Sequence, residues 1–227
     1  MKKNIHPAWV SKDPMSFFYR FMNFFSWYLF KFLFPFEFYG QERLKKGAFI
    51  IAANHASFLD PPLLGLACPE PVHYLAKDSL FKIPIFGFLI RKMNAHPLKG
   101  DASDIGVLKG ALKLLLEGSK VILFPEGKRS FDNKLSAIKP GLSLLVSKTD
   151  ARIVPTYIYG TYEAWPRKNL LPKFRAKIGC VFGSPFGWSE FSHLEKKQAQ
   201  LLFAEKLKNA IEDLKKWHES GSIGTPP

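Results

Sequence analysis

Cysteine is scarce in this chain of 227 residues, which contains only Cys68 and Cys180. The two lie far apart and form no Cys-x-x-Cys pair, so neither a zinc site nor a thiol–disulfide motif is indicated. Two buried thiols in a reducing compartment are the simpler interpretation, and a single disulfide between them is the alternative.

Acidic residues are also few: 19 Asp and Glu stand against 33 Lys and Arg, which gives a formal charge of +14. This excess favours an anionic partner, which is a nucleic acid, an acidic membrane surface or a phosphorylated small substrate. The 22 Phe residues fit apolar or membrane contact at least as well as a nucleic-acid surface, because Phe carries no polar atom. The basic start, Met1 to Lys3, is not followed directly by an apolar segment, so we expect no secretion signal.

Aromatic residues are concentrated between Phe17 and Phe36, where they occupy twelve of twenty positions. On a helix that advances about 100° per residue, one narrow arc contains Arg20, Asn23, Trp27 and Lys31. The pattern predicts that residues 1–36 associate with an anionic membrane through an amphipathic helix, with Arg20, Trp27 and Lys31 at the polar interface. A helix packed on the protein core and a true span are the alternatives, and cations near mid-span make the span costly.

Beyond residue 36, short apolar runs alternate with amphipathic stretches, and 47% of all residues are hydrophobic, enough for a packed core. This predicts a single α/β domain over residues 37–218, with a central mixed sheet flanked by helices, and a disordered tail at 219–227. The expected strands are 48–53, 72–76, 94–98, 121–124, 153–159 and 176–182. The expected helices are 56–66, 101–117, 141–148 and a long one that ends near residue 217.

Three of the expected strands carry unusual polar chemistry at or near their ends. Asn54 and His55, with Asp60, follow the first, Glu126 to Ser130 follow the fourth, and Pro155 and Thr156 lie within the fifth, which Gly160 follows. Because sites in open α/β sheets collect at the carboxyl ends of strands, we expect these segments to converge.

His55 and Asp60 are the first candidates for catalysis. Five residues apart on a continuous helix they would point about 140° away from each other, so a contact requires a turn, which Ser57 and the following prolines allow. An imidazole whose Nδ1 proton is held by a carboxylate has its Nε2 free to accept a proton, as a general base needs. The alternative is that Asp60 only caps a helix.

The segment from Phe124 to Ser130 places a carboxylate, a glycine and two cations after an apolar strand. Arg129 offers a planar fork suited to two phosphate oxygens. A P-loop is excluded because position 122 is Ile, and no Gly-x-Ser-x-Gly elbow occurs. A histidine base without a serine or cysteine nucleophile fits direct attack by a substrate hydroxyl on an activated acyl group.

These motifs resemble those of a known family. The run Asn-His-Ala-Ser-Phe-Leu-Asp at 54–60 resembles the His-x4-Asp motif of the glycerolipid acyltransferases, and Phe124 to Ser130 resembles their Phe-Pro-Glu-Gly-x-Arg-Ser motif. Val154 to Gly160 is similar to their Val-Pro-x4-Gly motif. The order and separations also fit, and the closest similarity is to the bacterial 1-acylglycerol-3-phosphate acyltransferase branch.

The resemblance implies a role for each matching residue. His55 would deprotonate the acceptor hydroxyl, and Asp60 would orient His55 and stabilise its charge. Substrate-binding roles fall to Glu126, Gly127, Arg129, Ser130, Lys99 and Pro155. Lys99 stands where the family usually has an arginine. A lysine keeps the positive charge but lacks the planar guanidinium that can bind two phosphate oxygens. The apolar run 83–90 is either an acyl-tunnel wall or buried core, and His73 and His96 are expected to be structural.

The resemblance also implies the partners. An acyl thioester of CoA or acyl carrier protein would be the donor, lysophosphatidic acid the acceptor and phosphatidic acid the product, without a metal or tightly bound cofactor. The protein would lie peripherally or monotopically on the cytoplasmic face of the cell membrane, with an anionic membrane surface rather than nucleic acid as partner. Glycerol 3-phosphate or another lysolipid is an alternative acceptor, and a non-catalytic basic protein that binds membrane or nucleic acid is the alternative from another class. The sequence leaves the oligomeric state open.

Overall fold

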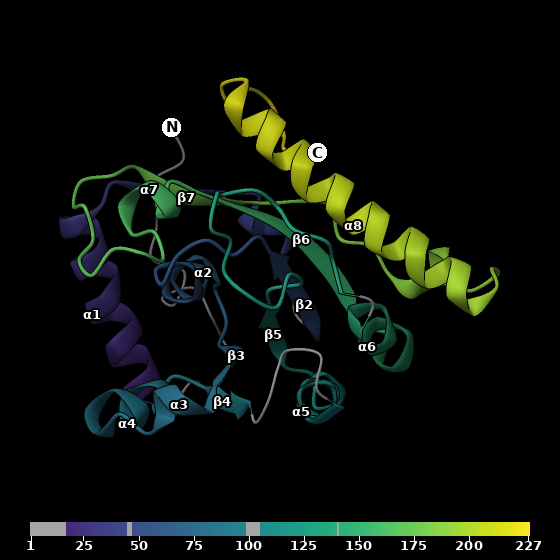
Figure 1. Cartoon of the computed structure of the whole chain (residues 1–227), viewed down its shortest axis with the longest axis horizontal. Coiled ribbons are helices and arrows are strands. Elements are labelled where there is room, and N and C mark those ends of the chain that lie inside the picture. Colours follow the sequence, from purple (N-terminus) through teal and green to yellow (C-terminus); the bar gives the residue numbers. More distant parts are fainter. Residues whose placement is uncertain (1–16, 45–46, 99–104, 140) are drawn as a thin grey trace.

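A computed structural model describes residues 17–44, 47–98, 105–139 and 141–227, and within them seven strands form one mixed sheet (Figure 1). The strand order is β1-β7-β6-β2-β5-β3-β4, with all neighbours parallel except β6 and β7. The strands are β1 (Phe36–Tyr39), β2 (Phe49–Ala53), β3 (Val72–Lys77), β4 (Ala95–Leu98), β5 (Lys120–Leu123), β6 (Arg152–Tyr159) and β7 (Ile178–Phe182). The predicted α/β fold with a mixed sheet is therefore confirmed.

Helices flank the sheet and fill the connections between parallel strands. They are α1 (Phe17–Leu33), α2 (Asp60–Ala67), α3 (Asp78–Phe81), α4 (Pro84–Lys92), α5 (Ile105–Leu116), α6 (Gly141–Thr149), α7 (Thr161–Ala164) and α8 (Lys196–Glu219), with 3-10 turns η2 (Gln41–Arg43) and η3 (Trp188–Glu190). The predicted helices and strands match these to within a few residues. Strand β1 and the short helices α3, α4 and α7 were not predicted, because four to nine residues give little periodicity.

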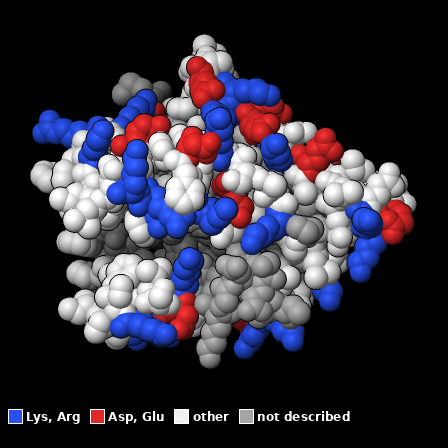
Figure 2. Space-filling model, viewed as in Figure 1, with Lys and Arg blue, Asp and Glu red and all other residues white. Residues whose placement is uncertain are grey.

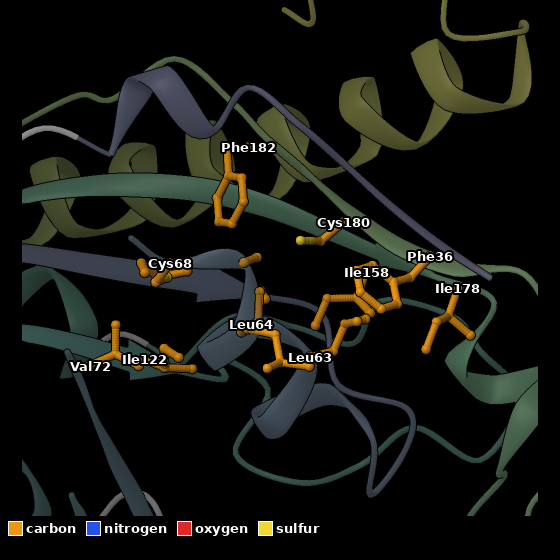
Figure 3. Packing of buried hydrophobic residues seen from close by; sticks show 14 of the residues in the cluster. Phe36, Leu63, Leu64, Cys68, Val72, Ile122, Ile158, Ile178, Cys180 and Phe182 are labelled. Carbon is orange, nitrogen blue, oxygen red and sulfur yellow. The ribbon is translucent and has the colours of Figure 1, made fainter. Parts of the chain in front are cut away.

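Two hydrophobic clusters cover the two faces of the sheet. Residues of α1 and α2 pack with Ile51, Ile122 and Val154 on one face, where Cys68 and Cys180 also lie as free, buried thiols (Figure 3). Residues of α5, α6 and α8 pack on the other face. The buried β2 lies between β6 and β5, so its carboxyl end opens at the middle of the sheet. That position is where the first polar motif begins.

Helix α1 is part of the core rather than a separate segment. Tyr19, Asn23, Trp27 and Phe30 are buried, and the Trp27 ring packs edge-on against Phe36 with 4.9 Å between centroids. The prediction that Trp27 lies at a membrane interface is therefore wrong. Aromatic residues surround this helix, so the polar arc did not mark its outward side, and Asn23 instead faces inward toward the carbonyl of Gly65.

The predicted membrane contacts of Arg20 and Lys31 stay predictions. Arg20 and Lys31 are exposed, and so are most of the Phe residues between them. In the described parts of the chain, no helix combines the length and hydropathy that a bilayer crossing requires.

The apolar run at 83–90 is not buried core, and its role as an acyl-tunnel wall stays a prediction. It begins just before α4 and largely coincides with that helix, which leaves Ile85 86% exposed and Phe88 58% exposed. Phe88 contacts Phe18 of α1, with ring centroids 6.3 Å apart. The run is therefore an outward apolar surface beside α1.

The tail at 219–227, predicted to be disordered, is placed against the domain. The Arg43 guanidinium donates hydrogen bonds to the carbonyls of Pro226 and Pro227, and Trp217 donates its indole N–H to the carbonyl of Ile223. Composition alone predicted disorder because it shows neither the contact with the distant Arg43 nor the one with the nearby Trp217.

Candidate active site

The turn between β2 and α2 brings His55 and Asp60 together. The Nδ1 atom of His55 lies 2.7 Å from Oδ2 of Asp60, and the same oxygen accepts the backbone N–H groups of Ala56 and Ser57 at 2.7 Å each. Three donors on one oxygen close the turn that the spacing required. Asp60 is 1% exposed, so its carboxylate is fixed by these bonds and shielded from water.

The imidazole of His55 is oriented for proton transfer. With Nδ1 held by Asp60, its Nε2 has no hydrogen-bond partner among the described residues, and the side chain keeps 16% exposure. The ring stacks on Phe124, with centroids 3.9 Å apart. Asn54 fixes the main chain just before it, because its amide exchanges two hydrogen bonds with the backbone of Ile158 in β6 at 2.7 and 2.9 Å.

Glu126 has a different role from the predicted one. It is 4% exposed; its Oε1 accepts the backbone N–H of His55 at 2.8 Å and its Oε2 accepts that of Ser136 at 2.9 Å. Burial raises the pKa of Glu126, while these hydrogen bonds act in the opposite direction. A buried carboxylate with both oxygens occupied would repel a phosphate, so the predicted phosphate contact of Glu126 is wrong. The carboxylate instead ties two loops together.

Gly127 and Ser130 shape the loop that carries Arg129. Gly127 has a φ of 73°, a left-handed conformation that glycine adopts without strain, and its N–H bonds to the carbonyl of Phe124. Ser130 donates its backbone N–H to the carbonyl of His55 at 2.7 Å, and its hydroxyl donates to Asp132. The Ser130 hydroxyl is thus used within the loop rather than directed at a ligand.

Arg129 is the predicted phosphate-binding residue that remains available. Its guanidinium lies over the ring of Phe58, with Cζ 3.5 Å from the centroid. Burial and the nearby charge of Arg167 lower the pKa of Arg129, and Asp60 raises it. Arg129 Nη1 and Asp60 Oδ1 are both buried without a hydrogen-bond partner among the described residues. Unpaired buried polar atoms from both motifs indicate a place for a polar ligand or water.

Two other predicted residues do not join this cluster. Pro155 is buried within β6 beside Ala52 of β2, a position in the sheet rather than in the loops that carry His55 and Arg129. Lys99 lies outside the described residues. The described chain also holds no group of three or more His, Cys, Asp or Glu side chains that could bind a metal ion.

Two contributions to the site were not predicted. Asn54 was noted at the end of the strand, but only the pairing of β2 with β6 reveals its hydrogen bonds to Ile158. Arg167 belongs to no motif, and its charge acts on Arg129 from the loop after α7. No local pattern distinguishes Arg167 from an ordinary surface arginine.

Comparison with known proteins agrees with the motifs. The chain is 29% identical over 178 residues to the 1-acyl-sn-glycerol-3-phosphate acyltransferase of Bacillus subtilis, covering 78% of this chain and 86% of that protein. It is 35% identical over 119 residues to the chloroplastic 1-acyl-sn-glycerol-3-phosphate acyltransferase LPAT1 of Arabidopsis thaliana, covering 52% of this chain and 33% of that one.

A solved structure also matches over most of the chain. The crystal structure of the 1-acyl-sn-glycerophosphate acyltransferase PlsC from Thermotoga maritima aligns with a TM-score of 0.73 and 27% identity, covering 92% of this chain and 85% of that one. The family model described as Acyltransferase matches residues 35–159, more than half of the sequence and all the residues of the His55 and Arg129 motifs. The chain therefore belongs to the acyltransferase family.

Proposed function

We propose that this enzyme transfers an acyl group from acyl-CoA or acyl carrier protein to the sn-2 hydroxyl of 1-acylglycerol 3-phosphate, which gives phosphatidic acid. The observation that carries the proposal is the 2.7 Å contact between His55 Nδ1 and Asp60 Oδ2, next to the available guanidinium of Arg129. The relatives named above, which are 1-acyl-sn-glycerol-3-phosphate acyltransferases, support this acceptor.

The chemistry follows from the free Nε2 of His55. This nitrogen takes the proton of the acceptor hydroxyl as the oxygen attacks the thioester carbonyl carbon. The C–S bond then breaks, and the thiolate leaves with the proton that the imidazolium returns. The buried carboxylate of Asp60 keeps the Nδ1–H tautomer in place and stabilises the transient imidazolium. No covalent enzyme intermediate is needed, because the substrate supplies the nucleophile.

Arg129 supplies the charge that the acceptor's phosphate needs. Arg129 lies in the loop after β5, and one of its nitrogens is buried without a hydrogen-bond partner among the described residues. This nitrogen suits a charge-assisted hydrogen bond to a phosphate oxygen. The neighbouring Ser130 N–H···O bond to His55 fixes the distance between this phosphate site and the base. An acceptor held at its phosphate therefore presents its hydroxyl to the imidazole.

We also propose that the enzyme works on an anionic membrane, with the surface formed by α1, α4 and the segment 170–174 facing the lipid. Five of the six most exposed large apolar side chains among the described residues lie there, each at least 74% exposed: Phe17, Phe32, Ile85, Leu170 and Leu171. The sixth, Ile223, lies in the C-terminal tail. The ring of Phe34, the residue directly after α1, contacts the ring of Phe174, so the segment 170–174 lies beside the end of α1. Figure 1 shows α1, α4 and the loop after α7 on the same side of the molecule.

Basic residues border this apolar surface. Arg20 and Lys31 lie on α1, and Arg91 and Lys92 end α4, where they lie over the rings of Phe81 and Phe88. Apolar side chains framed by cations fit a bilayer with anionic headgroups. Because acyl-CoA and acyl carrier protein are cytoplasmic, we expect the cytoplasmic face of the membrane.

A panel of acceptors tests the function. Purified enzyme is incubated with acyl-CoA and, separately, with 1-acylglycerol 3-phosphate, glycerol 3-phosphate and lysophosphatidylcholine, while free thiol and lipid products are measured. Thiol release that depends on 1-acylglycerol 3-phosphate, with phosphatidic acid as product, is the expected result. Preferred turnover of another acceptor would replace this assignment. Absence of turnover with every acceptor, with acyl-CoA and in a repeat with acyl-acyl carrier protein, would refute the acyltransferase proposal.

A further inference from the structure

The loop after α7 brings a second arginine, Arg167, to the site. Pro166 forms an isolated antiparallel bridge with Ser57, and the Ser57 hydroxyl donates to the carbonyl of Trp165 at 2.8 Å. The Trp165 ring contacts Phe58, with centroids 5.5 Å apart. These contacts attach the residues just before Arg167 to the turn that holds His55 and Asp60.

Each arginine rests on an aromatic ring of a neighbouring segment. Arg129 lies over Phe58 of the His55 turn, and the Cζ atom of Arg167 lies 4.4 Å from the ring centroid of Phe131, two residues after Arg129. The Tyr162 hydroxyl donates to the carbonyl of Phe131 at 2.7 Å and so fixes this second support. Stacking on an aromatic ring leaves the edge of a guanidinium, with its donors, free for a ligand.

Neither guanidinium is neutralised within the described chain. Neither forms an ion pair with a described carboxylate, and Arg129 Nη1 is buried without a partner. The charge of Arg167 lowers the pKa of Arg129, which means that the two cations repel each other. Figure 2 shows Lys and Arg side chains beside a hollow on the face in view. An anion between the two arginines would remove the repulsion.

We propose that Arg167 is a second phosphate-binding residue of the acceptor site and that, together with Arg129, it makes the enzyme select a phosphomonoester over a phosphodiester. This inference rests on the proposed acyl transfer to 1-acylglycerol 3-phosphate. A phosphomonoester carries close to two charges at neutral pH and three unsubstituted oxygens, so it can serve two guanidinium forks at once. A diester has one charge and two such oxygens, and satisfies one fork.

The test compares Arg167→Gln with the wild-type enzyme and with Lys168→Gln, a matched control that removes the same charge from the neighbouring exposed residue. Acceptors are a short-chain 1-acylglycerol 3-phosphate and the corresponding lysophosphatidylglycerol, both kept monomeric and without vesicles so that membrane binding does not contribute. Glycerol 3-phosphate serves as a competitive inhibitor that reports phosphate binding directly. Arg167→Lys tests whether the fork or only the charge is needed.

For Arg167→Gln we expect the KM for the phosphomonoester to rise about 10- to 100-fold, with unchanged KM for acyl-CoA and weaker inhibition by glycerol 3-phosphate. The preference for the monoester over the diester should fall by a similar factor, and Arg167→Lys should recover it in part. The inference is wrong if Arg167→Gln keeps the wild-type preference for the monoester. It is also wrong if Lys168→Gln has an equal effect, because the net charge of the loop would then explain both results. If the wild-type enzyme acylates neither acceptor, the proposed function itself fails.

Discussion

The Oε1 atom of Glu126 accepts the backbone N–H of His55 at 2.8 Å, so the loop after β5 holds the main chain from which the imidazole projects. The same loop returns a second bond, from the Ser130 N–H to the His55 carbonyl. Both peptide groups of His55 are thereby attached to the loop that carries Arg129. This connection sets the relative position of the proposed base and the proposed phosphate site.

Glu126→Gln should impair turnover more than acceptor binding. The amide keeps one oxygen for the His55 N–H, but its NH2 group cannot accept the Ser136 N–H, so the loop must move. We expect kcat to fall about 10- to 100-fold with little change in the KM for 1-acylglycerol 3-phosphate. Steady-state kinetics beside Glu205→Gln, an exposed control on α8, measures this. A rise in the KM for 1-acylglycerol 3-phosphate at unchanged kcat would instead support a direct contact between Glu126 and the phosphate.

Asp60→Asn should remove most activity and some stability. The amide has nearly the shape of the carboxylate, yet it cannot stabilise an imidazolium at His55, so we expect kcat to fall by about 10² to 10⁴. The Asp60 oxygen that accepts three N–H bonds would lose its charge, which should lower the free energy of unfolding by about 1 to 3 kcal/mol. Kinetics and urea unfolding test both parts. A variant with near-normal kcat would show that Asp60 only caps the turn.

Acid should weaken the fold through His73 in β3. Burial, and then the charge of His96, lower the pKa of His73 from 6.5 to about 4, and Nδ1 of His73 lies 2.9 Å from Nε2 of His96. The unfolded chain therefore binds this proton more tightly than the folded one, so stability is fully present above pH 6.5 and is lost as the pH falls toward 4.

His73→Gln should reduce this loss, because glutamine does not titrate yet keeps a polar group beside His96. Melting temperatures of wild type, His73→Gln and the exposed control His193→Gln, measured from pH 7 to pH 4, give the comparison. If the melting temperature declines equally in all three proteins, protonation of His73 does not cause the loss of stability in acid.

The proposed membrane surface predicts a graded loss of vesicle binding. Ile85→Glu and Leu171→Glu place a charge on α4 and in the segment 170–174, where the side chains are 86% and 74% exposed, so the fold should tolerate them. Each should weaken flotation with anionic vesicles about tenfold or more, because it removes an apolar contact and adds repulsion. Leu201→Glu on α8, 65% exposed, is the matched control. Binding that resists both changes would confine the contact to α1.

The sequence predicted best where a local pattern determines the structure. The buried run of β2 predicted the strand, and Ser57 together with the prolines that begin α2 allowed the turn that brings His55 to Asp60. Arg129 was placed by the same logic, since a fork after an apolar strand faces the carboxyl edge of the sheet. These inferences needed only neighbours in the chain.

The predictions that failed depend on distant contacts. The phosphate role of Glu126 was wrong because its partner Ser136 comes ten residues later, after an irregular loop. Trp27 was misplaced because aromatic residues surround α1 and only packing against Phe36 selects the buried side. Arg167 was missed because its approach to the site depends on the bridge between Pro166 and Ser57, more than a hundred residues apart.

The most direct test of the account is the rate of acyl transfer by His55→Ala. With acyl-CoA and 1-acylglycerol 3-phosphate at saturation, thiol release should fall at least about 100-fold, because the variant lacks the imidazole that takes the hydroxyl proton. Circular dichroism should stay close to wild type and the melting temperature should fall only modestly, because Asp60 Oδ2 keeps its two backbone N–H donors when the His55 ring is lost. A folded His55→Ala enzyme that keeps more than a tenth of the wild-type rate would contradict the general-base mechanism.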